Sequence, residues 1–309
     1  MNSKNTSDQQ GITADINELL NLRFKAQNIQ FFNSQRVNTN QVGQHVSRAR
    51  GRGMDFEEVR HYQPGDDIRL MHWPLTARLG KPYTKVYKEE RERAIYFIVD
   101  QTASMQFGTR VCFKSVLAAK VCALLGWAAL NHHEQVGGVV FSDEGLYQLT
   151  PARSRTHLLK FFKCLSDPEN MLRPSNSHSM AMTLKNLSKT LKSGSVVIVI
   201  SDFVHFDDEA EQYLKLINRK SEIIQVFTYD PLEASLPDRG QYCFSDGQLH
   251  FLELNAADKN VHKRYAEPFN QRLDRIKALS SKHNMQFVAL ATNDDVVKTL
   301  NHGVMRYGY

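Results

Sequence analysis

Two uninterrupted apolar runs constrain the fold of this chain more than any other feature of its sequence. Residues 94–99 read AIYFIV and residues 195–200 read SVVIVI; Asp100 follows the first run directly, and Asp202 follows the second after one serine. A strand that is covered on both faces reads as a continuous apolar run because neither face meets water. The two runs therefore predict central strands of a sheet that carries helices on both sides.

Helical and extended patterns alternate along the chain after Arg93. Further strands are expected over 135–142, 146–149, 222–228 and 286–291. The expected helices are 111–131, 155–165, 180–191, 207–218 and 265–283, with a hairpin of two short strands within 230–254. Such alternation is typical of an open, mostly parallel α/β sheet. Ligands of these sheets lie beyond the carboxyl ends of the strands, which is where Asp100 and Asp202 are expected.

The N-terminal part of the chain divides into shorter pieces. A polar tail over 1–11 precedes a helix that the apolar spacing predicts from residue 12 to about 32, and a basic loop follows. Turn signals and alternating side chains make 54–93 a β-rich segment with Trp73 as its core. About forty residues cannot easily bury an independent core without disulfides or metal, so we expect this segment to pack on the α/β domain. The expected division is a tail 1–11, a helix and β-rich segment 12–93, an α/β domain 94–300 and a tail 301–309.

Composition and charge exclude several classes of protein. With 41% hydrophobic and 23% charged residues, the chain is neither disordered nor collagenous. A net charge of +6 over 309 residues is mild, and no aromatic residues interleave the basic ones, so nucleic acid is not an expected partner. The four cysteines form no C-x-x-C pair, and the chain does not start with a basic leader followed by an apolar run. The most apolar stretch, 111–130, contains two lysines, which favours a core helix over a membrane span and predicts a cytoplasmic location.

The segment after the first apolar run has the residue types of a cation site. Asp100, Thr102 and Ser104 alternate, which puts three oxygen atoms on one face of a tight loop. Hard divalent cations such as Mg²⁺ bind such oxygens together with one or two carboxylates, and Asp202 fits the second carboxylate. Short polar residues after a strand also serve as helix caps. The pattern resembles the metal-ion-dependent adhesion site of von Willebrand factor A domains.

A longer resemblance starts before this motif. Residues 53–69 read GMDFEEVRHYQPGDDIR, and they are followed by His72-Trp73, Thr76-Ala77-Arg78, the Asp100 motif and Ser201-Asp202-Phe203. This series resembles the signature of the domain of unknown function 58 family, von Willebrand A-like proteins associated with MoxR-type AAA+ ATPases. The resemblance implies a von Willebrand A-like, Rossmann-like sheet flanked by helices. It also implies a cytoplasmic adaptor or co-chaperone that works with a MoxR-type ATPase and a client protein, and it brings no catalytic residues.

The sequence departs from the adhesion-site pattern at two places. Thr102 stands where serine is usual, which keeps an oxygen ligand. The loop before Met180 would supply a threonine in a full site, but His178 stands there between Ser177 and Ser179. Histidine is a poor ligand for Mg²⁺. The expected ligands of Mg²⁺ or Mn²⁺ are Asp100, Thr102, Ser104, Asp202, Ser177 and Ser179; without an ion, the two facing carboxylates would favour another cation, a water or a nearby basic side chain.

Three functions remain open on this sequence. The first is a binding adaptor whose partner completes the coordination of a metal, and the second is an interaction scaffold that needs no metal. The third is a metal-dependent hydrolase. Against it, the sequence shows neither a positioned base nor a second metal cluster. No G-x-x-x-x-G-K-[ST] or G-x-S-x-G is present, so we expect a protein that is not an enzyme. No membrane span is expected, although its partners can be membrane-bound.

Overall fold

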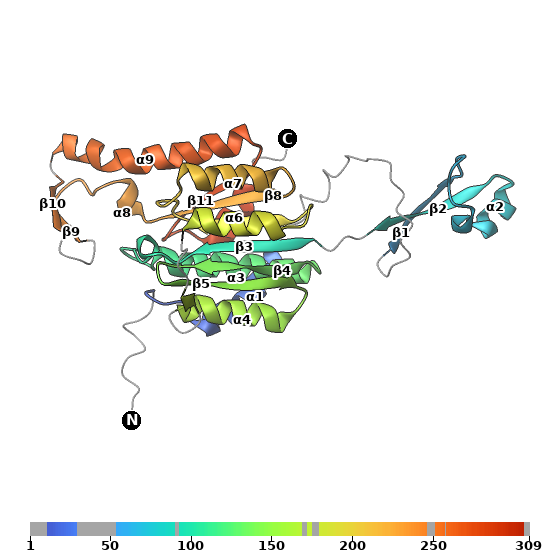
Figure 1. Cartoon of the computed structure of the whole chain (residues 1–309), viewed down its shortest axis with the longest axis horizontal. Coiled ribbons are helices and arrows are strands. Elements are labelled where there is room, and N and C mark those ends of the chain that lie inside the picture. The colour runs from blue at the N-terminus through green and yellow to red at the C-terminus, as the bar shows by residue number, and fades with distance from the viewer. Residues whose placement is uncertain are drawn as a thin grey trace, which may run out of the picture. The chain divides into compact units, whose positions relative to one another are not determined.

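The structure is a computed structural model that describes residues 11–29, 54–89, 93–168, 172–174, 179–245, 251–256 and 258–305. The chain divides into two units. The larger unit comprises residues 1–38 and 93–309, and the smaller one comprises residues 39–92. Figure 1 labels their helices and strands.

The larger unit is built around one mixed sheet. Its seven strands are β3 (Ala94–Asp100), β4 (Gln135–Phe141), β5 (Gly145–Ala152), β6 (Arg173–Pro174), β7 (Val196–Ser201), β8 (Glu222–Tyr229) and β11 (Gln286–Ala291). They lie in the order β11-β8-β7-β3-β4-β5-β6. The pairs from β11 to β4 are parallel, and the two pairs beyond β4 are antiparallel. The mostly parallel sheet that the apolar runs predicted is confirmed, with β3 and β7 side by side in its middle.

Helices cover both faces of this sheet (Figure 1). One face packs against α1 (Ile16–Lys25), α3 (Lys114–Asn131), α4 (Arg155–Ser166) and α10 (Val296–Met305). The other face packs against α6 (Met180–Thr190), α7 (Asp208–Asn218) and α9 (Lys259–Lys282). Successive side chains of a strand point to opposite faces, so Phe97 and Val99 enter the first core and Ile98 enters the second.

Helix α3 is apolar on most of its circumference, which suits its position between the sheet and two other helices, α1 and α4. Within the part of the chain that the structure describes, it is the one helix long and apolar enough to cross a membrane, but 83% of it is buried inside the protein. Its neighbour α1 packs on it, and the indole N–H of Trp127 donates to the carbonyl of Leu19 at 3.0 Å. The sequence grouped the N-terminal helix with residues 54–93, whereas its contacts place it in the larger unit.

Short elements complete the larger unit. They are η1 (Ala26–Asn28), η4 (Ala103–Met105), α8 (Pro231–Ala234), and the strands β9 (Gln241–Ser245) and β10 (Phe251–Asn255). The last two pair antiparallel as the expected hairpin.

The smaller unit is an antiparallel pair with a helical connection. Strands β1 (Met54–His61) and β2 (Tyr83–Glu89) pair, and η3 (Ile68–Leu70) and α2 (Trp73–Leu79) lie between them in sequence. The guanidinium of Arg60 contacts the carboxylate of Asp66 at 2.7 Å, which ties the end of β1 to the turn that follows it. The expectation that residues 54–93 pack on the α/β domain stays a prediction.

The sequence interpretation of Trp73 was wrong. It begins α2 instead of lying in a strand, and it is 59% exposed instead of forming a core. Two local features start the helix here: the ring of His72 accepts a hydrogen bond from the Leu75 N–H at 3.1 Å, and Pro74 occupies the first turn, where its missing N–H costs nothing.

Candidate functional site

The candidate site lies where the two central strands end. Strands β3 and β7 pair in parallel, so their carboxyl ends lie at the same rim of the sheet. Asp100 ends β3, and Asp202 comes directly after β7. Both side chains are fully buried. The sheet therefore brings the two predicted carboxylates to one rim, as their positions after the apolar runs indicated.

Three hydrogen bonds hold the carboxylate of Asp100. Its Oδ1 accepts from the backbone N–H of Thr102 at 2.9 Å and from the Thr102 hydroxyl at 2.7 Å. Its Oδ2 accepts from the hydroxyl of Ser201 at 2.6 Å. The Ser201 oxygen accepts in turn from the N–H of Phe203 at 2.8 Å. Asp100 thus ties the loop after β3 to the end of β7.

The environment of Asp100 raises the pKa of its carboxyl group above the ordinary value. Burial raises the pKa of Asp100 from 3.8 to about 6, and the negative charge of Asp202 adds to the rise. The hydrogen bonds from Ser201 and Thr102 act in the opposite direction. The rim therefore holds one carboxyl group that titrates in the mildly acidic range.

A lysine engages the second carboxylate. The Nζ of Lys114 lies 2.7 Å from Oδ2 of Asp202 and 2.7 Å from Oε1 of Glu233. Lys114 is the first residue of α3 and is 1% exposed, so its ammonium group is removed from water between two carboxylates. The other oxygen of Asp202 accepts from the N–H of Val204 at 3.0 Å. A buried charge is tolerated when it is paired and hydrogen-bonded in this way.

The lysine contact continues into a network that joins four loops. Glu233 also accepts from the N–H of Asp230 at 2.9 Å, which completes a capping box at α8. Asp230 accepts from the hydroxyls of Thr109 and Thr292, both at 2.7 Å. Burial alone would raise the pKa of Asp230, but these hydrogen bonds together outweigh it, and the pKa lies below its ordinary value.

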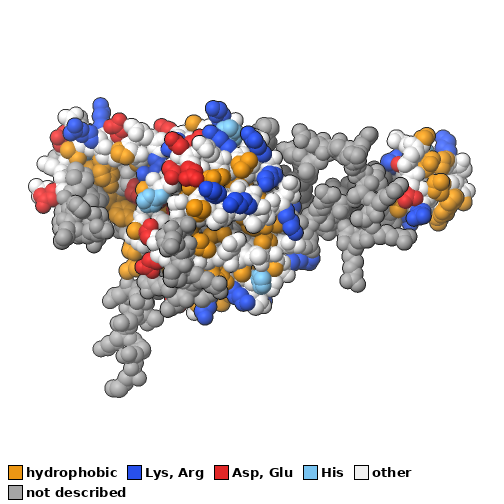
Figure 2. All heavy atoms as spheres, in the orientation of Figure 1, with side chains coloured by type: hydrophobic (Ala, Val, Ile, Leu, Met, Phe, Trp, Pro, Cys, Tyr) orange, Lys and Arg blue, Asp and Glu red, His pale blue; other side chains and the backbone are white. Residues whose placement is uncertain are grey.

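Exposed side chains surround this buried network. Seven of the exposed residues that follow the strands at the rim are Gln106, Arg110, Val111, Asp143, Glu144, Val204 and His205; we call these seven the rim surface. Val111 and Val204 are large exposed apolar residues, 57% and 42% accessible. Asp143 Oδ2 accepts from the N–H of Ala103 at 2.6 Å and so supports the loop that carries Thr102. In the view of Figure 2, acidic side chains lie mostly toward the end of the unit where β3 finishes, whereas most Lys and Arg lie toward the opposite end.

The structure describes the surroundings of Asp100, Thr102, Ser104 and Asp202, four of the expected ligands of a divalent cation. Thr102 Oγ1 and Ser104 Oγ lie 3.3 Å apart, near the spacing of about 3 Å between neighbouring ligands of an octahedral Mg²⁺. Lys114 and a backbone N–H, however, engage both oxygens of Asp202. The residues present therefore do not fit a divalent site that counts Asp202 as a ligand. Among the residues that the structure describes, no group of three or more His, Cys, Asp or Glu is placed to hold a metal ion.

The last two expected ligands belong to the loop before α6. The hydroxyl of Ser179 accepts from the N–H of Met182 at 3.2 Å, so it serves as the cap of that helix. Ser177 and His178 lie outside the described residues.

Sequence reasoning missed Lys114 and Glu233 as parts of the site. A signal existed for each. A lysine in the first turn of a helix opposes the helix dipole, which indicates a nearby anion. The residues from Asp230 to Glu233 read DPLE, an N-cap, a proline and an N3 glutamate that together mark a short helix. Neither signal, however, says that the two side chains meet.

Comparisons with known proteins place the chain beside proteins without a described activity. The family model described as "Protein of unknown function DUF58" matches residues 58–274. "Uncharacterized protein Rv1480" of Mycobacterium tuberculosis is 26% identical over 225 residues, which cover 72% of this chain and 70% of that protein. "Uncharacterized protein Mb1516" of Mycobacterium bovis matches with the same identity and coverage.

Two solved structures resemble parts of the chain. An aerotolerance-related membrane protein from Bacteroides fragilis covers 62% of this chain and 98% of its own, with 14% identity and a TM-score of 0.39. A membrane-spanning protein from Vibrio fischeri covers 69% and 98%, with 15% identity and a TM-score of 0.23. The cytoplasmic location expected from the sequence is contradicted by these neighbours, both of which are named as membrane proteins, and it is withdrawn.

Proposed function

The chain belongs to the DUF58 family, and from this premise we propose that it is a non-catalytic interaction module that binds a partner protein through its rim surface without a metal ion. The partner that the family resemblance suggests is a MoxR-type AAA+ ATPase, which would act with this protein on a client. The observation that supports the proposal is the ammonium of Lys114, 2.7 Å from Asp202.

The ammonium of Lys114 offsets negative charge at this rim, as a bound cation would. Asp100 and Asp202 are buried close enough that the charge of Asp202 raises the pKa of Asp100. Two facing carboxylates need a compensating charge, because an unpaired buried charge is costly. Lys114 supplies that charge from within the chain. A carboxylate from the partner is then not needed to complete a coordination sphere.

The rim surface offers other means of recognition. Val111 and Val204 provide exposed apolar contacts, and Asp143 and Glu144 at the same rim are exposed acids. Apolar residues ringed by polar ones are the usual anatomy of a protein-binding patch. A partner with apolar side chains and a basic edge would complement this surface.

The same contacts weigh against a hydrolase at the rim. Asp100 accepts three hydrogen bonds and Asp202 is held by Lys114 and Val204, so neither carboxylate points freely toward a substrate. A general base has to reach the proton that it abstracts. The scaffold without a metal is therefore the better account of this geometry.

The experiment measures the affinity of the full chain for the MoxR-type ATPase of the same genome, with Val204→Asp as the test variant. Leu216→Asp is the matched control, because Leu216 is a similarly exposed apolar residue, 39% accessible, on α7. We expect Val204→Asp to weaken binding by about tenfold or more and Leu216→Asp to leave it unchanged. Equal affinities of the two variants would overturn the assignment of the rim surface.

A second measurement distinguishes the interaction module without a metal ion from the metal-dependent adaptor. Titration of the wild-type chain with Mn²⁺, followed by electron paramagnetic resonance, should show no stoichiometric binding near neutral pH. Stoichiometric Mn²⁺ binding that Asp100→Asn abolishes would restore the metal-dependent adaptor.

A further inference from the structure

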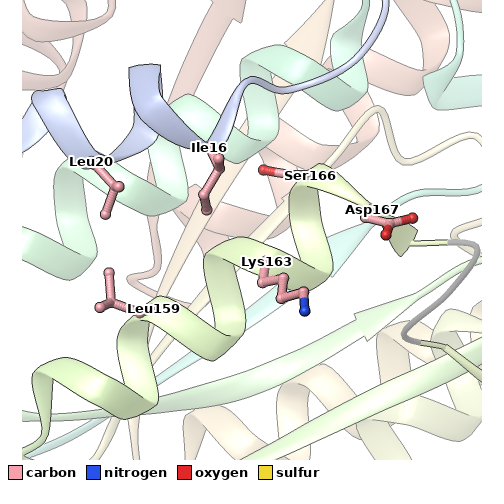
Figure 3. A pocket seen from close by; sticks show the side chains of 6 residues that line it. All are labelled: Ile16, Leu20, Leu159, Lys163, Ser166 and Asp167. Carbon is pink, nitrogen blue, oxygen red and sulfur yellow. The ribbon is translucent and has the colours of Figure 1, made fainter.

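A second candidate surface lies between α1 and α4, on the face of the sheet that α3 covers. Figure 3 shows a groove between α1 and α4 that is lined by Ile16, Leu20, Leu159, Lys163, Ser166 and Asp167; we call it the α1–α4 groove. Its volume is about 420 Å³. Leu20 points from α1 toward Leu159 of α4, and most of the atoms that face the groove are apolar although Lys163, Ser166 and Asp167 also line it.

Helix α1 carries a broad apolar face that the protein covers only in part. Leu19 and Leu22 are buried, and α1 packs on α3 and also contacts α4. Ile16 and Leu20 lie one turn apart, are partly buried against the core and line the groove. Phe24 continues this face by another turn and is 59% exposed. The part of the apolar face that the core leaves uncovered is available for a partner.

The walls of the groove are held in place independently of any occupant. The Trp127 indole fixes α1 through the Leu19 carbonyl. Leu158 and Phe162 are fully buried and fix α4 from its other side. The groove is therefore preformed, which lowers the entropic cost of binding.

The charged side chains around the α1–α4 groove indicate which charge a bound partner should carry. On α4, Arg155 and Lys163 lie four residues before and after Leu159, so two cations flank the apolar wall on the same face of the helix. Arg155 is fixed by stacking over the Trp127 ring at 5.5 Å. On α1, the carboxylate of Glu18 is already engaged by Lys120 at 2.7 Å. Asp167 is the acid that lines the groove, at the end of α4.

We propose that the α1–α4 groove binds an amphipathic helix of a partner protein, with apolar residues on one face and acidic residues along the edge that meets α4. Helix α1 has ten residues, about 15 Å in length, so two to three turns of a partner helix would fill the groove. Anchors at i, i+3 or i+4, and i+7 are how such a helix enters a groove. An anionic bilayer is a poorer fit, because Leu20 and Leu159 face each other across a concave space instead of protruding.

The test uses three fluorescent peptides of about fourteen residues with the folded full chain. The first is an amphipathic helix with leucines on one face and glutamates along one edge. The second has lysines in place of the glutamates, and the third has the first composition in scrambled order. Fluorescence anisotropy should show micromolar binding of the acidic amphipathic peptide and at least about tenfold weaker binding of the other two. Equal binding of the acidic peptide and its scrambled form would overturn the proposal.

Variants locate the binding. Lys163→Glu and Leu20→Ser should each weaken binding of the acidic peptide about fivefold or more. Lys189→Glu is the control, because Lys189 is exposed on α6 at the other face of the sheet. Unchanged affinity in both groove variants, with circular dichroism showing them folded, would contradict the assignment. Vesicles of phosphatidylcholine with one part in three phosphatidylglycerol address the alternative: binding to them that Lys163→Glu abolishes, with no peptide binding, would assign the surface to a membrane.

Discussion

The ammonium of Lys114 lies 2.7 Å from the carboxylate of Asp202, and both side chains are almost completely buried. The first residue of α3 thereby pairs with the residue that follows β7, so one ion pair fixes a helix start to the end of a central strand. Glu233 adds a second carboxylate at the same distance from the ammonium. One ammonium with two carboxylates thus ties the start of α3 to the end of β7 and to α8.

The first prediction concerns the loss of this ammonium. Lys114→Met should lower the free energy of unfolding by about 3–5 kcal/mol, because Asp202 would remain buried without its partner. Urea denaturation followed by circular dichroism measures the change. The double variant Lys114→Met with Asp202→Asn should recover part of the loss, since it removes the unpaired charge.

A lysine on the same helix provides the control. Lys120 pairs with Glu18 at a partly exposed position, so Lys120→Met should cost less than about 1 kcal/mol. Equal changes in the free energy of unfolding would mean that the buried ion pair contributes no more to stability than the partly exposed one.

The second prediction concerns pH. Because the pKa of Asp100 is about 6 in the folded protein and 3.8 without burial, the native state holds a proton that the unfolded state has lost between these values. The contribution of Asp100 to stability is therefore fully present below pH of about 4 and is lost as the pH rises through about 6. Between pH 4.5 and about 7.5 the wild-type free energy of unfolding should fall, relative to Asp100→Asn, by about 2 kcal/mol.

The difference between the two proteins is the useful quantity, because other carboxyl groups titrate in the same range. Asp230, whose pKa is lowered, contributes with the opposite sign to both. Hydrogen bonds that asparagine makes or loses appear as an offset that does not change with pH. Urea denaturation at four pH values from 4.5 to about 7.5 gives the slope; parallel curves for the two proteins would contradict the raised pKa.

The sequence predicted the central fold well because its signals there are strong. Residues 94–99 and 195–200 were expected as strands; β3 (Ala94–Asp100) extends one residue further, and β7 (Val196–Ser201) is shifted by one residue. Helix α9 was expected from residue 265 but starts at Lys259. Its first turns are polar and give no apolar periodicity; the cap by Asp258, which accepts from the Asn260 N–H at 2.8 Å, starts it instead.

The site was predicted less completely than the fold. The positions of Asp100 and Asp202 at one rim follow from strand ends in a parallel sheet, and this part could be reasoned from sequence. The expected need for a cation or a basic side chain near them could be reasoned as well. Which side chain fills that role could not, because Lys114 and Asp202 lie 88 residues apart and meet only through tertiary packing. Whether a divalent ion binds at Thr102 and Ser104 stays a prediction that the Mn²⁺ titration tests.

The third prediction concerns the closest approach of two strands in the sheet. Gly138 of β4 lies opposite Phe97 of β3, and a Cβ at Gly138 would lie 2.1 Å from the carbonyl oxygen of Phe97. Because the obstructing atom is backbone in the centre of the sheet, it cannot move without breaking the ladder. Gly138→Ala should therefore cost about 3 kcal/mol or more in the free energy of unfolding. Gly126→Ala on α3 is the control: its Cβ would meet a terminal methyl group of the Leu158 side chain, not backbone, at 2.8 Å. A side chain can shift more easily than a strand backbone, and alanine favours the helix by about 1 kcal/mol, so the net loss should be smaller. Urea denaturation of both variants decides the matter, and a Gly138→Ala protein as stable as the Gly126→Ala protein would show that β3 and β4 do not approach as closely as this register requires.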